Sequence, residues 1–291
     1  YLNKLLSTEK TDYVIASDTD SIYLNLGPVV DKFFGSKSSD KNKIVELLDK
    51  ICKDKLEPFI DASYQELASY VNAYDQKMIM KRENIASSGI WTAKKRYILN
   101  VWDSEGVRYN EPKLKMMGIE AVKSSTPMPC RDAIKNALKI MMSGGEEDLI
   151  TFIDKFKDEF DLLPPEDIAF PRSVNGLRKF KASGTVYSKG TPLHVRGTLL
   201  YNFHVAKNKL EYKYPLVQEG EKIKYLYLRR PNKINENVIS FLNTFPKELG
   251  LEGQIDRDAQ FKKSFLDPLQ IITKVIGWET ERVANLEFLF G

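Results

Sequence analysis

Cysteine and histidine are scarce in this chain, with two residues of each among 291. Cys52 and Cys130 fit no metal-ligand or redox spacing, and His194 and His204 stand alone, which argues against a zinc site and against a disulfide framework. Apolar runs long enough to cross a membrane are also absent. With 42% apolar and 29% charged residues, we expect a soluble, intracellular globular protein with no membrane partner.

Acidic residues are missing from one long segment: none lies between Asp167 and Glu211, although the chain is otherwise dense in acids. Because the net charge of the whole chain is only +4, this local imbalance is more informative than the total. It predicts a surface that faces a polyanion, with a chance basic loop region as the alternative. The basic residues of the segment are Arg172, Arg178, Lys179, Lys181, Lys189, Arg196, Lys207 and Lys209.

The most informative polar stretch is 17–21, with the sequence Ser-Asp-Thr-Asp-Ser. Half-apolar, strand-favouring segments flank it at 13–16 and 22–26, so we predict a β-hairpin with Asp18 and Asp20 at its tip. Two acids two positions apart project to the same side of an extended backbone, and a hard divalent cation would cancel their charge. Such pairs also occur in solvated turns, but we expect buried strands on both sides to fix these two acids.

Segment 13–26 resembles the third polymerase motif of family B DNA polymerases. Segment 92–97 (Thr-Ala-Lys-Lys-Arg-Tyr) resembles the Lys-Lys-x-Tyr element of that family, at the expected distance downstream. Segment 94–118 is similar to the replicative polymerases of large tailed phages almost residue for residue, and the resemblance fades to patches after about residue 205. It implies the C-terminal part of a DNA-directed DNA polymerase, with the remainder of the palm at 1–118, the thumb at 119–284 and a clamp-binding tail at 285–291.

The fold that we expect is α+β, with an antiparallel palm sheet and covering helices, followed by a mainly helical thumb. Helical spacing over 41–73 predicts helices, divided near Pro58, whose apolar stripe packs on the sheet, with a binding face as the alternative. The other predicted elements are a strand at 78–83, a hairpin of 90–102 and 107–109, helices at 130–142, 148–160, 235–245 and 261–275, strand alternation at 216–228, and loops with short helical turns over 171–210.

The resemblance implies that Asp20 is a metal ligand for nucleotidyl transfer and that Asp18 is a nearby acid with a less direct role. Two Mg²⁺ ions would clamp the attacking and leaving oxygens, which requires a second acid facing Asp20. The upstream motif that supplies this acid, the grip on the dNTP and the exonuclease acids have no match here. Glu83 resembles a third family carboxylate near the metals; a surface glutamate paired with Lys81 or Arg82 is the alternative.

In an extended strand over 94–97, Lys95 and Tyr97 would share one face and Lys94 and Arg96 the other. The resemblance implies that Lys95 and Tyr97 donate to minor-groove acceptors at the primer end, which every correct base pair offers. A solvated basic strand is the alternative. The residues that resemble backbone-gripping positions on primer–template DNA are Lys113, Lys115, Lys123, His194 and Arg196.

The last seven residues, 285–291, combine large apolar side chains with a terminal position. This tail resembles the peptides with which replicative polymerases bind a sliding clamp, through Leu286, Phe288, Leu289 and Phe290. A tail folded back onto its own thumb is the alternative.

Tyr1 opens the sequence inside a helical pattern, so we expect the chain to begin within a domain and to need an N-terminal polymerase portion for activity. If the protein is phage-encoded, the resemblance places it in the cytoplasm of the infected host cell. A non-catalytic DNA-binding and clamp-tethering module, with a vestigial acid pair, is the second hypothesis.

Overall fold

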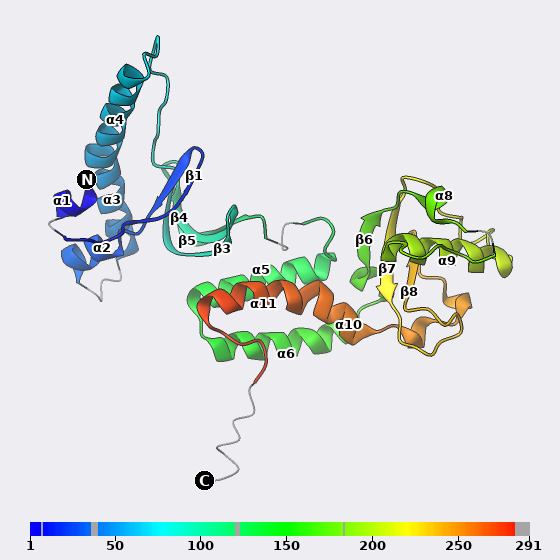
Figure 1. The fold of residues 1–291 in the computed structure, drawn as a ribbon. Coiled ribbons are helices and arrows are strands. Elements are labelled where there is room, and N and C mark those ends of the chain that lie inside the picture. Colours follow the sequence, from blue (N-terminus) through cyan, green and yellow to red (C-terminus); the bar gives the residue numbers. More distant parts are fainter. Residues whose placement is uncertain (7, 36–39, 120–122, 183, 283–291) are drawn as a thin grey trace, which may run out of the picture. The chain divides into compact units, whose positions relative to one another are not determined.

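The computed structural model describes residues 1–6, 8–35, 40–119, 123–182 and 184–282. It divides into two compact units: unit 1 comprises Tyr1–Gly89 and Ile98–Lys115, and unit 2 comprises Ile90–Tyr97 and Met116–Gly291 (Figure 1). Helices and antiparallel sheets make up both, which confirms the α+β class. No helix in the described ranges combines the length and the apolar content of a membrane-spanning segment. The assignment of palm, thumb and tail stays a prediction.

Unit 1 contains the predicted hairpin, formed by β1 (Val14–Asp18) and β2 (Ser21–Leu24). Asp18 pairs with Ser21 across the strands, and residues 19–20 form the turn. The expectation of buried strands is wrong, because β1 and β2 make a two-stranded sheet of their own and none of their residues is fully buried. Val14, Ile15 and Ile22 are 46%, 49% and 39% exposed.

The helices of unit 1 are α1 (Leu2–Leu6), α2 (Gly27–Phe34), α3 (Lys41–Ile51) and α4 (Glu57–Tyr70). A π turn, Cys52–Leu56, joins α3 to α4. Pro58, the second residue of α4, has no N–H with which to continue an α-helical hydrogen-bond ladder. The predicted helical stretch and its division are therefore present. The prediction that these helices pack on the sheet is wrong for α4, because none of the α4 side chains is fully buried.

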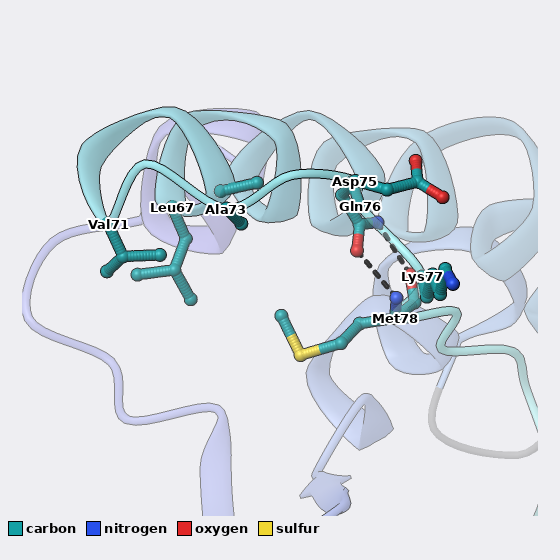
Figure 2. Close-up of a pocket in the computed structure, with 8 residues that line it drawn as sticks. Leu67, Val71, Ala73, Asp75, Gln76, Lys77 and Met78 are labelled. Carbon is teal, nitrogen blue, oxygen red and sulfur yellow. Dashed lines mark hydrogen bonds between the residues drawn. The ribbon is translucent and has the colours of Figure 1, made fainter.

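Beyond α4 the backbone turns at residues 71–72 and returns without regular secondary structure as far as residue 83, so the strand predicted at 78–83 is wrong. Side chains take the backbone donors that a sheet would use: Gln76 Oε1 accepts from the Met78 N–H at 2.5 Å, and Glu57 Oε1 accepts from the Arg82 N–H at 3.0 Å. A cavity of about 300 Å³ lies between the end of α4 and this returning segment (Figure 2).

A three-stranded sheet contributes to both units, in the order β3 (Asn84–Ala93), β4 (Arg96–Ser104) and β5 (Val107–Met117). The turn at residues 105–106 was predicted. A second turn at residues 94–95 was not, so the single strand expected over 90–102 is in fact two strands. Within unit 1, Ile98 and Val101 of β4 are buried.

Unit 2 contains a helical bundle of α5 (Met128–Ser143), α6 (Glu146–Leu162), α7 (Pro165–Ile168), α10 (Arg257–Phe261) and α11 (Asp267–Thr273). A π turn, Lys262–Leu266, joins α10 to α11, and a 3₁₀ turn, Lys274–Ile276, ends the run. Its core is aromatic: Phe156 lies 4.8 Å from Phe265 between ring centroids, and Phe160 lies 5.2 Å from Phe261. The predicted helices at 130–142 and 148–160 correspond to α5 and α6. The single helix predicted at 261–275 is a run of α10, a π turn, α11 and a 3₁₀ turn, and α7 was not predicted.

The rest of unit 2 packs helices on an antiparallel sheet of β6 (Phe170–Ser173), β7 (Lys222–Tyr227) and β8 (Val238–Phe241). The helices are α8 (Leu177–Phe180) and α9 (Leu193–Lys207), with 3₁₀ turns at Lys247–Leu249 and Glu252–Gln254.

Two predictions for this region are wrong. Residues 193–207 are a helix and not loops, and residues 238–241 are a strand and not part of a helix.

Candidate functional site

Asp18 and Asp20 lie at the tip of the β1–β2 hairpin but differ in their surroundings. Asp18 ends β1 and is half-buried; its Oδ1 accepts the Thr19 N–H at 2.8 Å and the Thr19 hydroxyl at 3.3 Å. Asp20 lies in the turn and is exposed, and within the described residues no hydrogen bond or ion pair engages its carboxylate. The expectation that both acids project from extended backbone is wrong, because Asp20 is a turn residue.

The hairpin tip has the right chemistry for a hard divalent cation, since it offers two carboxylates and the Thr19 hydroxyl. It does not make a complete ligand set, because the described part of the chain contains no group of three His, Cys, Asp or Glu side chains that could hold a metal ion. Among the described residues, Asp18 and Asp20 therefore provide at most part of a metal site.

Glu83 lies at the entry to β3 and forms an ion pair with the Lys115 Nζ on β5. The hydrogen bond that Lys115 donates is the main reason why the pKa of the Glu83 carboxyl is lowered, whereas burial acts to raise that pKa. The predicted alternative partners, Lys81 and Arg82, do not pair with it. Two residues predicted for different roles, a metal-site acid and a DNA-gripping lysine, thus neutralise each other.

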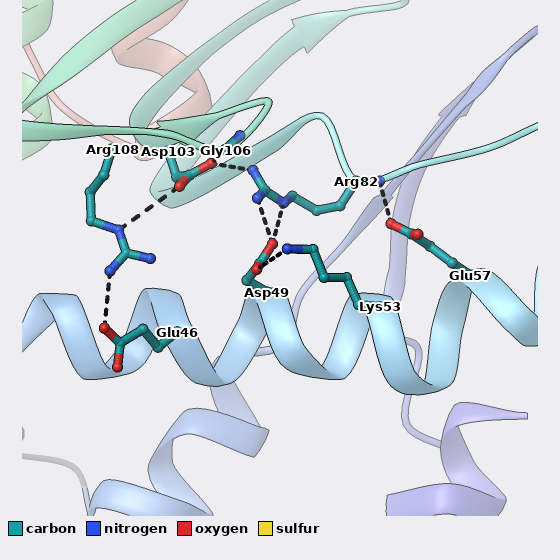
Figure 3. A network of polar contacts seen from close by, with 8 residues as sticks. All are labelled: Glu46, Asp49, Lys53, Glu57, Arg82, Asp103, Gly106 and Arg108. Carbon is teal, nitrogen blue, oxygen red and sulfur yellow. Dashed lines mark hydrogen bonds and ion pairs between the residues drawn. The ribbon is translucent and has the colours of Figure 1, made fainter.

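Arg82, next to Glu83, is the centre of a buried ion network that sequence reasoning missed (Figure 3). Its side chain is 8% exposed; Nε and Nη2 donate to Asp49 Oδ1 on α3 at 3.1 and 2.5 Å, and Nη1 donates to Asp103 at the end of β4. Asp103, with a side chain 3% exposed, also accepts the Gly106 N–H at 3.0 Å. The network fastens α3 to the end of β4 and fixes the backbone from which Glu83 projects.

Residues 94–97 belong to unit 2 and are not a single strand. Residues 94–95 form the turn between β3 and β4, with Lys95 in the left-handed region at φ +61°, and only Arg96 and Tyr97 are in β4. The predicted alternation over 94–97 is therefore wrong. Lys94, Lys95 and Arg96 are exposed, whereas Tyr97 is buried and its ring lies 6.2 Å from that of Trp91.

Gly118 packs closely against this turn. It has φ +66°, and a Cβ at this position would lie 2.7 Å from the Lys95 carbonyl oxygen and 3.0 Å from Arg96 Cγ. Only glycine lets the chain beyond β5 pass so close to the turn. A glycine at the end of a lysine-rich strand is the only sequence feature that could have indicated this contact, and Lys95 lies more than twenty positions before it.

The other predicted lysines of this region differ in surroundings. Lys113 is exposed on β5 in unit 1, with Nζ 4.1 Å from the centroid of the Tyr109 ring. Lys123 is half-buried in unit 2, and its carbonyl accepts the Thr126 N–H at 3.2 Å.

His194 and Arg196 lie in the first turn of α9. Burial, followed by the charge of Arg172, lowers the pKa of the His194 imidazole, so the ring is neutral near pH 7. Arg196 donates from Nη2 to Asn237 and lies 5.6 Å from the Tyr187 ring centroid, while its Nε is buried without a hydrogen-bond partner. Gly197 lets α9 approach β8, because a Cβ there would lie 2.5 Å from Ser240 Oγ.

Several cations in and beside the helical bundle of unit 2 form ion pairs, among them Lys157 with Asp161 at 2.5 Å and Arg282 with Glu147 at 2.9 Å. In the acid-free segment, by contrast, several exposed cations have neither an ion pair nor a side-chain hydrogen bond among the described residues: Arg178, Lys181, Lys189 and Lys209. These four side chains therefore carry exposed positive charge that no described acid neutralises.

The clamp-binding residues predicted in the tail, Leu286, Phe288, Leu289 and Phe290, lie outside the described residues.

No protein-family model matches the chain. Two curated proteins match its whole length: the DNA-directed DNA polymerase of Enterobacteria phage T4, 34% identical, and that of Escherichia phage RB69, 37% identical. Each alignment covers 303 positions and 100% of this chain but 33% of the relative, so the chain spans about a third of the length of the curated relatives that it matches.

Proposed function

Because the chain is homologous over its full length to DNA-directed DNA polymerases of the T4 and RB69 phages, we propose that it is the C-terminal part of a phage-type family B DNA polymerase. The full-length match is the observation that carries this proposal, and it agrees with the resemblance found in segments 13–26 and 92–118. In this proposal the substrates are primer–template DNA and dNTPs, and the reaction is template-directed nucleotidyl transfer.

The chain would contribute Asp20 as a ligand of Mg²⁺, with Asp18 as a second, less direct acid. Two such ions supply charge neutralisation for the attacking and leaving oxygens of an in-line displacement. The exposed carboxylate of Asp20, without a partner among the described residues, supports this role. Glu83 is the third candidate acid, and its ion pair with Lys115 would have to open before it could bind a metal.

DNA binding would use the exposed cations of unit 2 together with Lys113 and Lys115 of β5. The exposed turn residues Lys94 and Lys95, with Arg96, supply positive charge, and Gly118 allows the chain beyond β5 to pass close to this turn. Tyr97 is the residue proposed to report a correct primer end, and its burial against Trp91 would fix the ring. Arg178, Lys181, Lys189, Lys209 and Arg196 would contact phosphates, with Lys123 and His194 as further candidates, and such contacts hold a duplex without reading its sequence.

Catalysis requires the N-terminal polymerase portion, because the hairpin tip offers an incomplete ligand set. The test is to mix the purified chain with the N-terminal two thirds of the RB69 phage polymerase, Mg²⁺, dNTPs and a primed template. We expect no extension by either piece alone and Mg²⁺-dependent extension by the mixture. Asp20→Asn should lower the rate by roughly 10³-fold or more, as the loss of a transition-state charge clamp does, and Asp18→Asn should cost less. Robust extension by this chain alone would contradict the proposal.

A non-catalytic DNA-binding and clamp-tethering module is the second candidate function. The observation in its favour is the pairing of Glu83 with Lys115, which leaves the described acids dispersed. If the mixture with the Asp20→Asn variant synthesises as much DNA as the mixture with the wild-type chain, the non-catalytic module is favoured. In both functions the tail, 285–291, is proposed to bind the sliding clamp.

A further inference from the structure

Unit 1 contains more of the exposed large hydrophobic residues than unit 2 does. Of the twenty-one exposed large hydrophobic residues in the described chain, fourteen belong to unit 1, although it is the smaller of the two units. Only eight of the buried hydrophobic residues among those described belong to unit 1. Contiguous exposed apolar patches on folded proteins commonly mark interaction sites.

The largest concentration of exposed apolar side chains is at the end of α4. Six residues form what we call the α4-end patch, and their exposed fractions are 46% for Leu67, 85% for Tyr70, 58% for Val71, 105% for Tyr74, 47% for Met78 and 74% for Ile79. Leu67, Val71 and Met78 also line the cavity of about 300 Å³ beside them (Figure 2). The patch therefore combines protruding aromatic rings with a hollow that a partner side chain can fill.

The backbone of the α4-end patch is fixed by hydrogen bonds before any partner binds. Asn72 takes the left-handed conformation at φ +52°, which asparagine tolerates, and the Ala73 N–H donates to the Ala68 carbonyl at 2.9 Å to end α4. Gln76 then bonds the Met78 backbone twice, accepting its N–H at 2.5 Å and donating to its carbonyl at 2.7 Å (Figure 2). A loop held in this way loses little entropy on binding, which is a property of docking surfaces.

We propose that the α4-end patch is a docking surface for the polymerase portion that lies outside this chain. The occupant follows from length: the curated relatives are about three times as long as the matched region, and the exposed apolar residues are concentrated on one unit. This inference rests on the proposed function and adds where the missing portion attaches. Tyr70 and Tyr74 are the anchors, because large aromatic side chains dominate the binding energy of interfaces.

The experiment measures association of the chain with the N-terminal two thirds of the RB69 phage polymerase by sedimentation velocity and fluorescence titration. The test variant is Tyr70→Ser/Tyr74→Ser. The matched control is Tyr212→Ser, which removes an equally exposed tyrosine (84%) from unit 2. We expect the test variant to raise the Kd at least about tenfold, as loss of an aromatic anchor does. The control and Asp20→Asn should stay within about twofold. A single Ile79→Ser variant should show a smaller loss in the same direction.

Three outcomes would overturn the inference. Test variants that bind as tightly as wild type would show that the patch is not the docking surface, and the proposed function would stand if the mixture still extends primers. A wild-type chain that dimerises by itself, with the dimer lost in the test variant, would assign the patch to a second copy. If wild-type chain and the RB69 portion neither associate nor synthesise DNA, the inference and the proposed function both fall. An excess of the RB69 portion should restore synthesis to the test variant, because its catalytic residues are intact.

Discussion

Replacing Arg82 with alanine should strongly destabilise unit 1. The guanidinium is 8% exposed and is bonded to both Asp49 and Asp103. After Arg82→Ala the Asp103 carboxylate, 3% exposed, keeps the Gly106 N–H at 3.0 Å, and its nearest remaining cation is Arg108 Nε at 3.9 Å. Removing one partner of a buried ion pair costs about 3–5 kcal/mol, so we expect a loss of about 3 kcal/mol in the free energy of unfolding.

The assay is urea unfolding at pH 7, followed by tryptophan fluorescence and circular dichroism. Lys53→Ala is the matched control, because Lys53 Nζ contacts the same Asp49 at 2.7 Å but its side chain is 62% exposed. We expect this variant to stay within about 0.5 kcal/mol of wild type. Asp103→Asn in the Arg82→Ala background should recover more than half of the loss, since it removes the buried uncompensated charge. Equal losses in Arg82→Ala and Lys53→Ala would refute the reasoning.

The same network predicts a dependence on pH. Hydrogen bonds from Lys53 and then from Arg82 lower the pKa of the Asp49 carboxyl below its ordinary value of 3.8. A lowered carboxyl pKa stabilises the fold at pH values above 3.8, and this contribution disappears as the pH falls through the pKa of the folded state. The difference in stability between wild type and Arg82→Ala should therefore be full at pH 6 and shrink below pH 4. A difference that is constant from pH 6 to pH 3 would contradict this assignment.

Three further predictions concern unit 2 and the tail. Gly118→Ala should lower the free energy of unfolding by about 1–3 kcal/mol, whereas Gly220→Ala, also at positive φ but with open space around it, should cost less in the same urea titration. Duplex affinity should fall with salt by about 0.9 log units per log unit for each phosphate contact, and Arg196→Ala should weaken binding equally for duplexes of different sequence; salt-independent affinity would contradict the DNA-binding role. Deleting residues 285–291 should leave single-turnover extension by the assembled enzyme unchanged and shorten products only when the sliding clamp is present; lower thermal stability with unchanged product length would favour a tail that packs on its own thumb.

The sequence was sufficient for elements with strong local signals. Alternation and a polar centre located β1 and β2, Gly106 marked the turn between β4 and β5, and apolar periodicity located α5 and α6. Sequence reasoning failed for elements whose apolar residues do not lie on one face. α9 buries residues around much of its circumference, so no amphipathic stripe marks it as a helix. β8 is buried at all four positions, and a short run of apolar residues does not distinguish a buried strand from a segment of a buried helix.

The candidate site could be predicted only in part because two of its determinants are long-range. Lysine gives no local turn signal for the left-handed Lys95, and the close approach of Gly118 to its carbonyl joins residues far apart in the sequence. Glu83 pairs with Lys115 on β5, and because the two residues are far apart in the sequence, no local pattern links them. The hairpin acids were located correctly, but the position of Asp20 in the turn, with its carboxylate exposed, required the backbone geometry.

The two π turns have a consequence for how this chain tolerates length changes. Both Cys52–Leu56 and Lys262–Leu266 come directly before an acid and a proline, and in both the acid's N–H bonds the carbonyl five residues earlier. Each π turn accommodates one residue more than an α-helical turn, which shifts the helical phase by about 100°. Removing one residue from Cys52–Leu56 would therefore rotate all of α4 about its axis and carry Tyr70 to another side of unit 1, while one added or lost residue in a surface loop would leave every helix face where it is.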